Sequence, residues 1–168
     1  MFTDTKKLYL YILSWFPSIL VMIIIFSFSA RVADDSNRTS GGLTEKVIYV
    51  IECITNDTIE EGSPEYDRIH LIVRKTGHFL EYMALGCTFV LPYALLFKSK
   101  WKIFLLCEIS SAFYACTDEF HQLFVEGRSG NFKDVGIDST GALVGICVGF
   151  IIWIIIKKIV KCISKNSS

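Results

Sequence analysis

Long apolar blocks separated by charged segments dominate the pattern of this chain. A helix that crosses a bilayer needs about 20 largely apolar residues. Four stretches have that character: 8–28, 76–97, 103–122 and 135–156. The pattern therefore predicts an all-α integral membrane protein, built as a four-helix bundle. We expect a single domain over residues 1–168, because no linker or repeat divides the chain.

The first apolar block has an alternative interpretation as a cleaved signal peptide. Phe28-Ser29-Ala30 ends in small residues, as cleavage sites do. The apolar core is longer than the usual h-region of about 7–15 residues, which favours an uncleaved anchor. Under either interpretation the N-terminus starts in the cytoplasm.

The basic residues outside the blocks predict the orientation in the membrane. Lysines precede the first block, join the second to the third, and follow the fourth: Lys6, Lys7, Lys98, Lys100, Lys102, Lys157, Lys158, Lys161 and Lys165. The 31–73 loop instead holds four basic residues against nine acidic ones. Short loops rich in Lys and Arg stay in the cytoplasm. We therefore expect a multi-pass protein of the cell membrane with both termini cytoplasmic, and the 31–73 loop and 119–134 connection outside.

Two further helical signals lie in the outer loop. Apolar residues recur at helical spacing over 43–54, with charges between them, which predicts an extracytoplasmic amphipathic helix. This helix would lie on the outer membrane surface, or cover the mouth of the bundle as a lid. Ser63-Pro64-Glu65 has the residue types of a helix N-terminus, so a helix starting there is expected to run through Arg74 into the second block.

The small residues and the cysteines indicate packing more than chemistry. Gly141, Gly145 and Gly149 recur every four residues, a spacing that lets another helix approach closely. Four of the six cysteines lie inside apolar blocks and no CxxC occurs, so neither a disulfide framework nor a zinc site is expected. The formal net charge of zero argues against a nucleic-acid partner.

Ionisable residues and one polar amide gather at the outer ends of blocks two, three and four. They are Lys75, His78, Glu81, Asp118, Glu119, His121, Gln122, Asp134 and Asp138, with Arg128 in the connecting loop. Charges inside spanning segments are costly, and they usually face a bundle interior or a watery cavity. One interpretation is structural, with Lys75 and Arg128 neutralising the acids. The other is a polar outer-leaflet pocket, favoured because ion pairing does not require His78.

Such a pocket would combine anion binding with proton transfer. Lys75 and Arg128 could bind a phosphate or carboxylate, with Gln122, Asp134 and Asp138 completing the binding site. The candidate general acids and bases are His78, Glu81, Asp118 and Glu119. No metal-binding spacing supports a metal site, and we predict no cofactor. Glu108 lies deeper in the third block and suggests a proton relay as an alternative.

Two stretches carry a pattern that resembles the VanZ-like family. They are 75–86 (KTGHFLEYMALG) and 118–129 (DEFHQLFVEGRS), followed by Asp134, Asp138 and the 141–145 segment (GALVG). Phe28-Ser29 with Ser36 also resembles the family's serine-containing end of the first span. The chain departs from the family pattern at Glu126, where proline is common, and at Asp138, where many members have asparagine.

The resemblance implies a bacterial cell-envelope membrane protein, with low-level resistance to teicoplanin-type glycopeptide and lipoglycopeptide antibiotics in some members. It implies no defined reaction, so the sequence does not decide whether the protein is an enzyme. Our leading hypothesis is a site that binds or modifies an anionic lipid headgroup or a lipid-linked wall precursor. A glycopeptide antibiotic is a further possible partner, and the oligomeric state is unknown. The alternatives are a non-catalytic membrane interaction module and a proton-coupled transporter.

Overall fold

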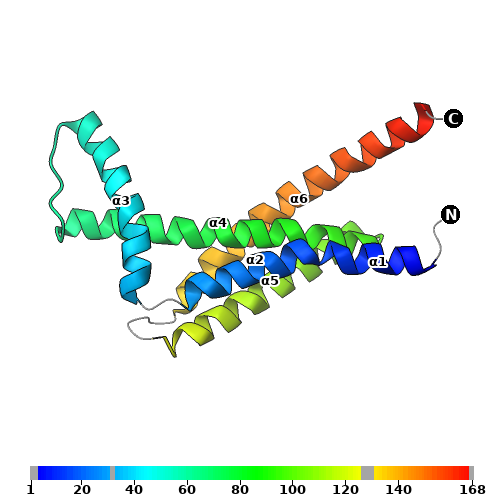
Figure 1. Cartoon of the computed structure of the whole chain (residues 1–168), viewed down its shortest axis with the longest axis horizontal. Coiled ribbons are helices and arrows are strands. Elements are labelled where there is room, and N and C mark those ends of the chain that lie inside the picture. The colour runs from blue at the N-terminus through cyan, green and yellow to red at the C-terminus, as the bar shows by residue number, and fades with distance from the viewer. Residues whose placement is uncertain (1–3, 31–32, 126–130, 167–168) are drawn as a thin grey trace.

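The structure is a computed structural model, and it describes residues 4–30, 33–125 and 131–166. Within these ranges the chain is helical, with no strand. The helices are α1 (Asp4–Ser14), α2 (Phe16–Ser29), α3 (Ala33–Thr55), α4 (Pro64–Leu96), α5 (Lys100–Gln122) and α6 (Phe132–Asn166). The α1–α2 column, α4, α5 and the first half of α6 run lengthwise beside one another, and α3 lies across the N-terminal part of α4 (Figure 1). The predicted all-α fold class is therefore confirmed.

Three helical segments are long and apolar enough to cross a membrane, among those the structure describes. They are Thr5–Ser29, Pro64–Leu96 and Phe132–Lys165. They contain the first and fourth predicted spans and all but the last residue of the second. The third predicted span, 103–122, also forms a helix, α5, but α5 does not reach the same threshold. Its charged residues lower its apolar character: Lys100, Lys102, Glu108, Asp118 and Glu119.

The long helix α4 begins where the sequence predicted. Ser63 is the N-cap, and its Oγ accepts a hydrogen bond from the Tyr66 backbone N–H at 3.1 Å. Pro64 occupies the first turn, where its missing N–H has no hydrogen bond to lose. The helix then continues without a break through Arg74 to Leu96. At about 1.5 Å per residue, such a helix is longer than the hydrocarbon core of a bilayer, which is about 30 Å thick.

Two helix boundaries differ from the predicted ones. α3 begins at Ala33, ten residues before the amphipathic pattern starts at position 43. The prediction missed these residues because the polar 33–42 segment has no apolar periodicity. α6 continues to Asn166, well beyond the predicted end at 156, because its lysine-rich tail keeps good helix formers and contains no proline. Figure 1 shows this last part of α6 diverging from the other helices.

The glycine stripe forms the closest helix contact. A Cβ at Gly141 would overlap the backbone oxygen of Phe79, and a Cβ at Gly145 would overlap that of Met83. From the other side, a Cβ at Gly86 would overlap the backbone oxygen of Ala142. Because only glycine permits this approach, the α4–α6 pair makes the most extensive helix contact of the structure. The predicted packing role of the stripe is confirmed.

Apolar side chains form the core and also cover much of the outer faces of the helices. Buried side chains from α2, α4, α5 and α6 form one cluster: Ile25, Tyr82, Leu85, Phe89, Val90, Ile103, Cys107, Ala115 and Ile146. Large apolar side chains such as Ile23, Phe113 and Ile155 are at least half exposed on the outer faces. All six cysteines are free, in agreement with the sequence. Apolar groups on both the inside and the outside are typical of helices surrounded by lipid.

Candidate functional site

The polar residues of α4 and α6 meet across the helix pair at the end where α6 begins. Lys75 Nζ lies 2.8 Å from Asp134 Oδ1, a hydrogen-bonded ion pair whose side chains are about one-third exposed. One helical turn deeper, His78 Nδ1 lies 3.9 Å from Asp138 Oδ1. The spacings 75/78 on α4 and 134/138 on α6 place each pair of residues on the facing side of its helix.

Asp138 is the most confined member of the site. Its side chain is completely buried, and neither carboxylate oxygen has a hydrogen-bond partner among the described residues. The separation of 3.9 Å from His78 is too long for a hydrogen bond. Glu81, Asp118, Glu119 and Asp134 are near enough to interact electrostatically with it. A carboxylate in such a place calls for a compensating donor or cation.

A second polar group belongs to the C-terminal turns of α5. Asp118, Glu119 and Gln122 are all buried. Gln122 Nε2 donates to Asp118 Oδ2 at 3.2 Å, which is an i to i+4 bond within the helix. Glu119 Oε2 accepts a bond of 2.7 Å from the backbone N–H of Asn131. Glu119 therefore ties the end of α5 to the start of α6.

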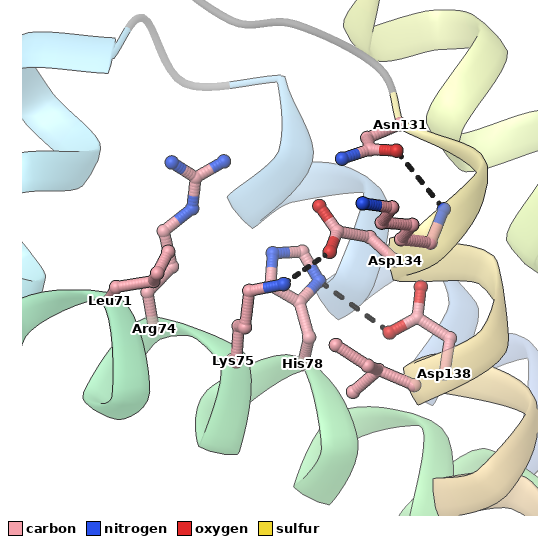
Figure 2. Close-up of a pocket in the computed structure, with 9 residues that line it drawn as sticks. Leu71, Arg74, Lys75, His78, Asn131, Asp134 and Asp138 are labelled. Atoms are coloured by element: carbon pink, nitrogen blue, oxygen red, sulfur yellow. Dashed lines mark hydrogen bonds and ion pairs between the residues drawn. The ribbon is translucent and has the colours of Figure 1, made fainter. Parts of the chain in front are cut away.

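Between α4 and α6 lies a pocket of about 380 Å³. Its wall consists of Leu71, Arg74, Lys75, His78, Asn131, Lys133, Asp134, Ile137 and Asp138. Figure 2 shows Arg74 at one side, Asp138 at the other, and Lys75 and His78 between them. The pocket is thus polar and cationic near Arg74 and Lys75, and acidic at Asp138.

The predicted site residues divide into two groups. The pocket wall includes four of them: Lys75, His78, Asp134 and Asp138. Glu81, Asp118, Glu119 and Gln122 do not line it, although Glu81, Asp118 and Glu119 interact electrostatically with Asp138 from behind. Arg128, with the rest of the 126–130 loop, lies outside the described residues. Within the described part of the chain, no three His, Cys, Asp or Glu side chains are arranged to hold a metal ion.

Sequence reasoning missed three polar residues of the pocket wall. Arg74 and Lys133 add cationic groups, and Asn131 adds an amide. A helical projection would have found Arg74, because positions 71, 74, 75 and 78 share one face of an α-helix. Nothing in the local sequence of Lys133 distinguishes it from an ordinary surface lysine.

The fold and the pocket together define the class of protein: an all-helical chain with three membrane-span-capable helices and a polar pocket at one end of them. The model of the VanZ/LLP1 family matches residues 14–156. The chain therefore belongs to the VanZ-like family, as its motifs indicated. Comparisons with curated proteins and with solved structures give no match.

Proposed function

We propose that this VanZ-like protein is a multi-pass protein of the bacterial cell membrane whose α4–α6 pocket opens to the outer leaflet and binds an anionic phosphate headgroup. The observation that carries the proposal is the cationic lining of the pocket by Arg74, Lys75 and Lys133 at one level of two apolar helices. Arg offers a bidentate fork for phosphate, and lysine offers a point charge.

The sidedness follows from the lysines of the sequence. Both termini and the 98–102 turn would be cytoplasmic, and α3 and the start of α6 would be outside. α5 would form the fourth span in spite of its charges. Its acids Asp118 and Glu119 are buried and not lipid-facing, which lowers the cost of placing them in a membrane.

The same pocket permits either binding alone or catalysis. His78 faces the buried acid Asp138 from α4, so it has the environment of a general acid or base. Glu81, Asp118 and Glu119 would act from the second layer behind Asp138. The ligand would be a membrane lipid or a lipid-linked wall precursor, and its binding would give low-level protection against teicoplanin-type antibiotics.

The first test is resistance in cells that carry variants of the predicted site residues. We expect Lys75→Ala, His78→Ala and Arg128→Ala, each confirmed to reach the membrane, to lose protection against teicoplanin. Lys46→Ala on the exposed side of α3 is the matched control and should protect as wild type does. Full protection by all three site variants would refute the proposal.

A non-catalytic interaction module is the second candidate, favoured by one observation on α3. Leu43, Val50 and Ile54 are all more than half exposed along one side of this helix. The glycine stripe does not support this candidate, because Gly141, Gly145 and Gly149 face α4. Deleting the 43–54 segment with the pocket intact should leave protection in place under our proposal and abolish it under this alternative.

A proton-coupled transporter is the third candidate, and substitution of Glu108 tests it. Its Oε2 is buried and has no hydrogen-bond partner within the described ranges, in keeping with its deep position on α5. A proton relay would require Glu108, so Glu108→Gln would abolish protection and Arg128→Ala would not. Our proposal expects the opposite pattern in the same resistance assay.

A further inference from the structure

At the acidic end of the pocket, the Asp138 carboxylate needs a hydrogen-bond donor. Asp138 lines the pocket, is completely buried, and has two carboxylate oxygens for which the described part of the chain provides no hydrogen-bond partner. Buried polar atoms in folded proteins nearly always have such a partner. His78 Nδ1 lies 3.9 Å from Asp138 Oδ1, which is too far for a direct hydrogen bond. A donor supplied by the occupant of the pocket would satisfy these oxygens.

The end of the pocket opposite Asp138 is cationic and would bind an anionic group. Arg74 and Lys75 come from successive positions of α4. Lys75 is partly neutralised by Asp134 at 2.8 Å. Figure 2 shows the Arg74 guanidinium on the side of the pocket away from Asp138. The lining is therefore polarised, with cations at one end and a buried acceptor at the other.

We propose that the ligand of this pocket is a phosphodiester headgroup that ends in a hydrogen-bond donor, a hydroxyl or a primary ammonium, which reaches Asp138 while the phosphate lies at Arg74 and Lys75. This inference rests on the proposed function, because it assumes that an anionic headgroup occupies the pocket. It extends that proposal by naming the donor group through which the pocket would select one lipid headgroup over another.

The size of the pocket agrees with a headgroup and excludes something larger. At about 380 Å³ it lies near the small end of the range of about 300–1,000 Å³ that is usual for small-molecule sites. A phosphate with a short polar substituent fits such a space. A glycopeptide antibiotic, with its several rings, does not. The antibiotic is therefore not the ligand of this pocket.

A metal ion would be the other way to compensate a buried carboxylate. The structure does not favour it, because the described residues contain no group of three or more metal-ligand side chains in suitable geometry. A quaternary ammonium would supply charge but no N–H. Only a donor group supplies both proximity and a hydrogen bond to the Asp138 oxygens.

The test compares lipids that differ only in the donor. The full-length protein in detergent is offered equal amounts of phosphatidylglycerol and phosphatidylethanol, and native mass spectrometry counts the bound lipid. Both lipids are singly charged phosphodiesters, but only the first carries free hydroxyls. A second pair, phosphatidylethanolamine and phosphatidylcholine, tests the ammonium in the same way.

We expect a preference of roughly tenfold for the donor-bearing lipid in at least one pair, the size of one hydrogen bond to a charged group. The pair that shows it identifies the donor. Asp138→Leu should reduce that preference to near one, because leucine fills the space without an acceptor. Asp57→Leu, in the exposed loop before α4, is the matched control and should keep the wild-type preference.

Three outcomes are distinguishable without the variant. A preference in the wild-type protein supports the inference. Equal retention within both pairs overturns it but leaves the anionic pocket standing. Absence of specific retention of all four lipids overturns the inference and the proposed function together.

Discussion

The buried carboxylate of Asp138 gives the site its most specific residue. It interacts with four other acids, and no described hydrogen bond stabilises it. A group in this state reduces the stability of the folded protein unless a ligand compensates for it. Our proposal therefore assigns Asp138 to ligand binding and not to the stability of the fold.

We expect Asp138→Leu to raise the stability of the lipid-free protein. Removing an unsatisfied buried acceptor should add about 1–3 kcal/mol to the free energy of unfolding. Thermal unfolding in detergent, followed by circular dichroism, measures the change. The same variant should be insensitive to added donor-bearing lipid, whereas the wild-type protein should gain stability from it. A lower midpoint for Asp138→Leu would show that the carboxylate has stabilising partners.

The Lys75–Asp134 pair is more exposed than the His78–Asp138 contact one turn away. Its side chains are 36% and 26% exposed, so water and salt weaken the attraction. A double-mutant cycle with Lys75→Met and Asp134→Asn should give a coupling energy of about 0.5–1 kcal/mol. A coupling above about 3 kcal/mol would mean that lipid shields the pair and that it lies inside the hydrocarbon.

At the scale of helices, the α4–α6 crossing holds the pocket together. The Lys75–Asp134 ion pair and the His78–Asp138 contact both join these two helices, so the register of one helix relative to the other fixes the distances within the site. The glycine contacts set that register one to three turns below the pocket. A displacement of either helix would therefore separate Lys75 from Asp134 and His78 from Asp138 together.

Substitution of two glycines on α6 tests this arrangement. A Cβ at Gly145 would overlap the Met83 backbone, so Gly145→Ala should cost about 1–3 kcal/mol of stability and also weaken lipid binding. Gly136 lies on the same helix with nothing within 4 Å of its Cβ position. Gly136→Ala should be neutral or stabilising by up to about 1 kcal/mol. Equal thermal midpoints for the two variants would contradict the close crossing.

The elements were more predictable than the contacts between them. The apolar blocks, the Ser63 cap and the glycine stripe are local signals, and each corresponds to a helix, a helix start or a close contact in the structure. The start of α3 was not predictable, since the 33–42 segment has no apolar face. The pairing of Lys75 with Asp134, and the exclusion of Asp118 from the pocket wall, depend on helix rotation and crossing, which spacing along one helix does not determine.

For the whole molecule, the orientation makes a prediction that native cysteines can test. Cys53 on α3 and Cys162 near the end of α6 are both exposed and free. In single-cysteine variants that keep one or the other, a membrane-impermeant maleimide should label Cys53 on intact cells. Cys162 should react only after the membrane is permeabilised. Labelling of Cys162 on intact cells would reverse the topology and place the pocket on the cytoplasmic side.

The central claim is that the pocket between α4 and α6 holds an anionic headgroup. The most direct measurement is an experimental structure of the full-length protein in nanodiscs that contain phosphatidylglycerol. Our account predicts density for a phosphate beside Arg74 and Lys75, with the headgroup extending to Asp138 and the acyl chains in the outer leaflet. A pocket filled only with water, or a lipid phosphate bound elsewhere with Arg74 and Lys75 turned away, would contradict it.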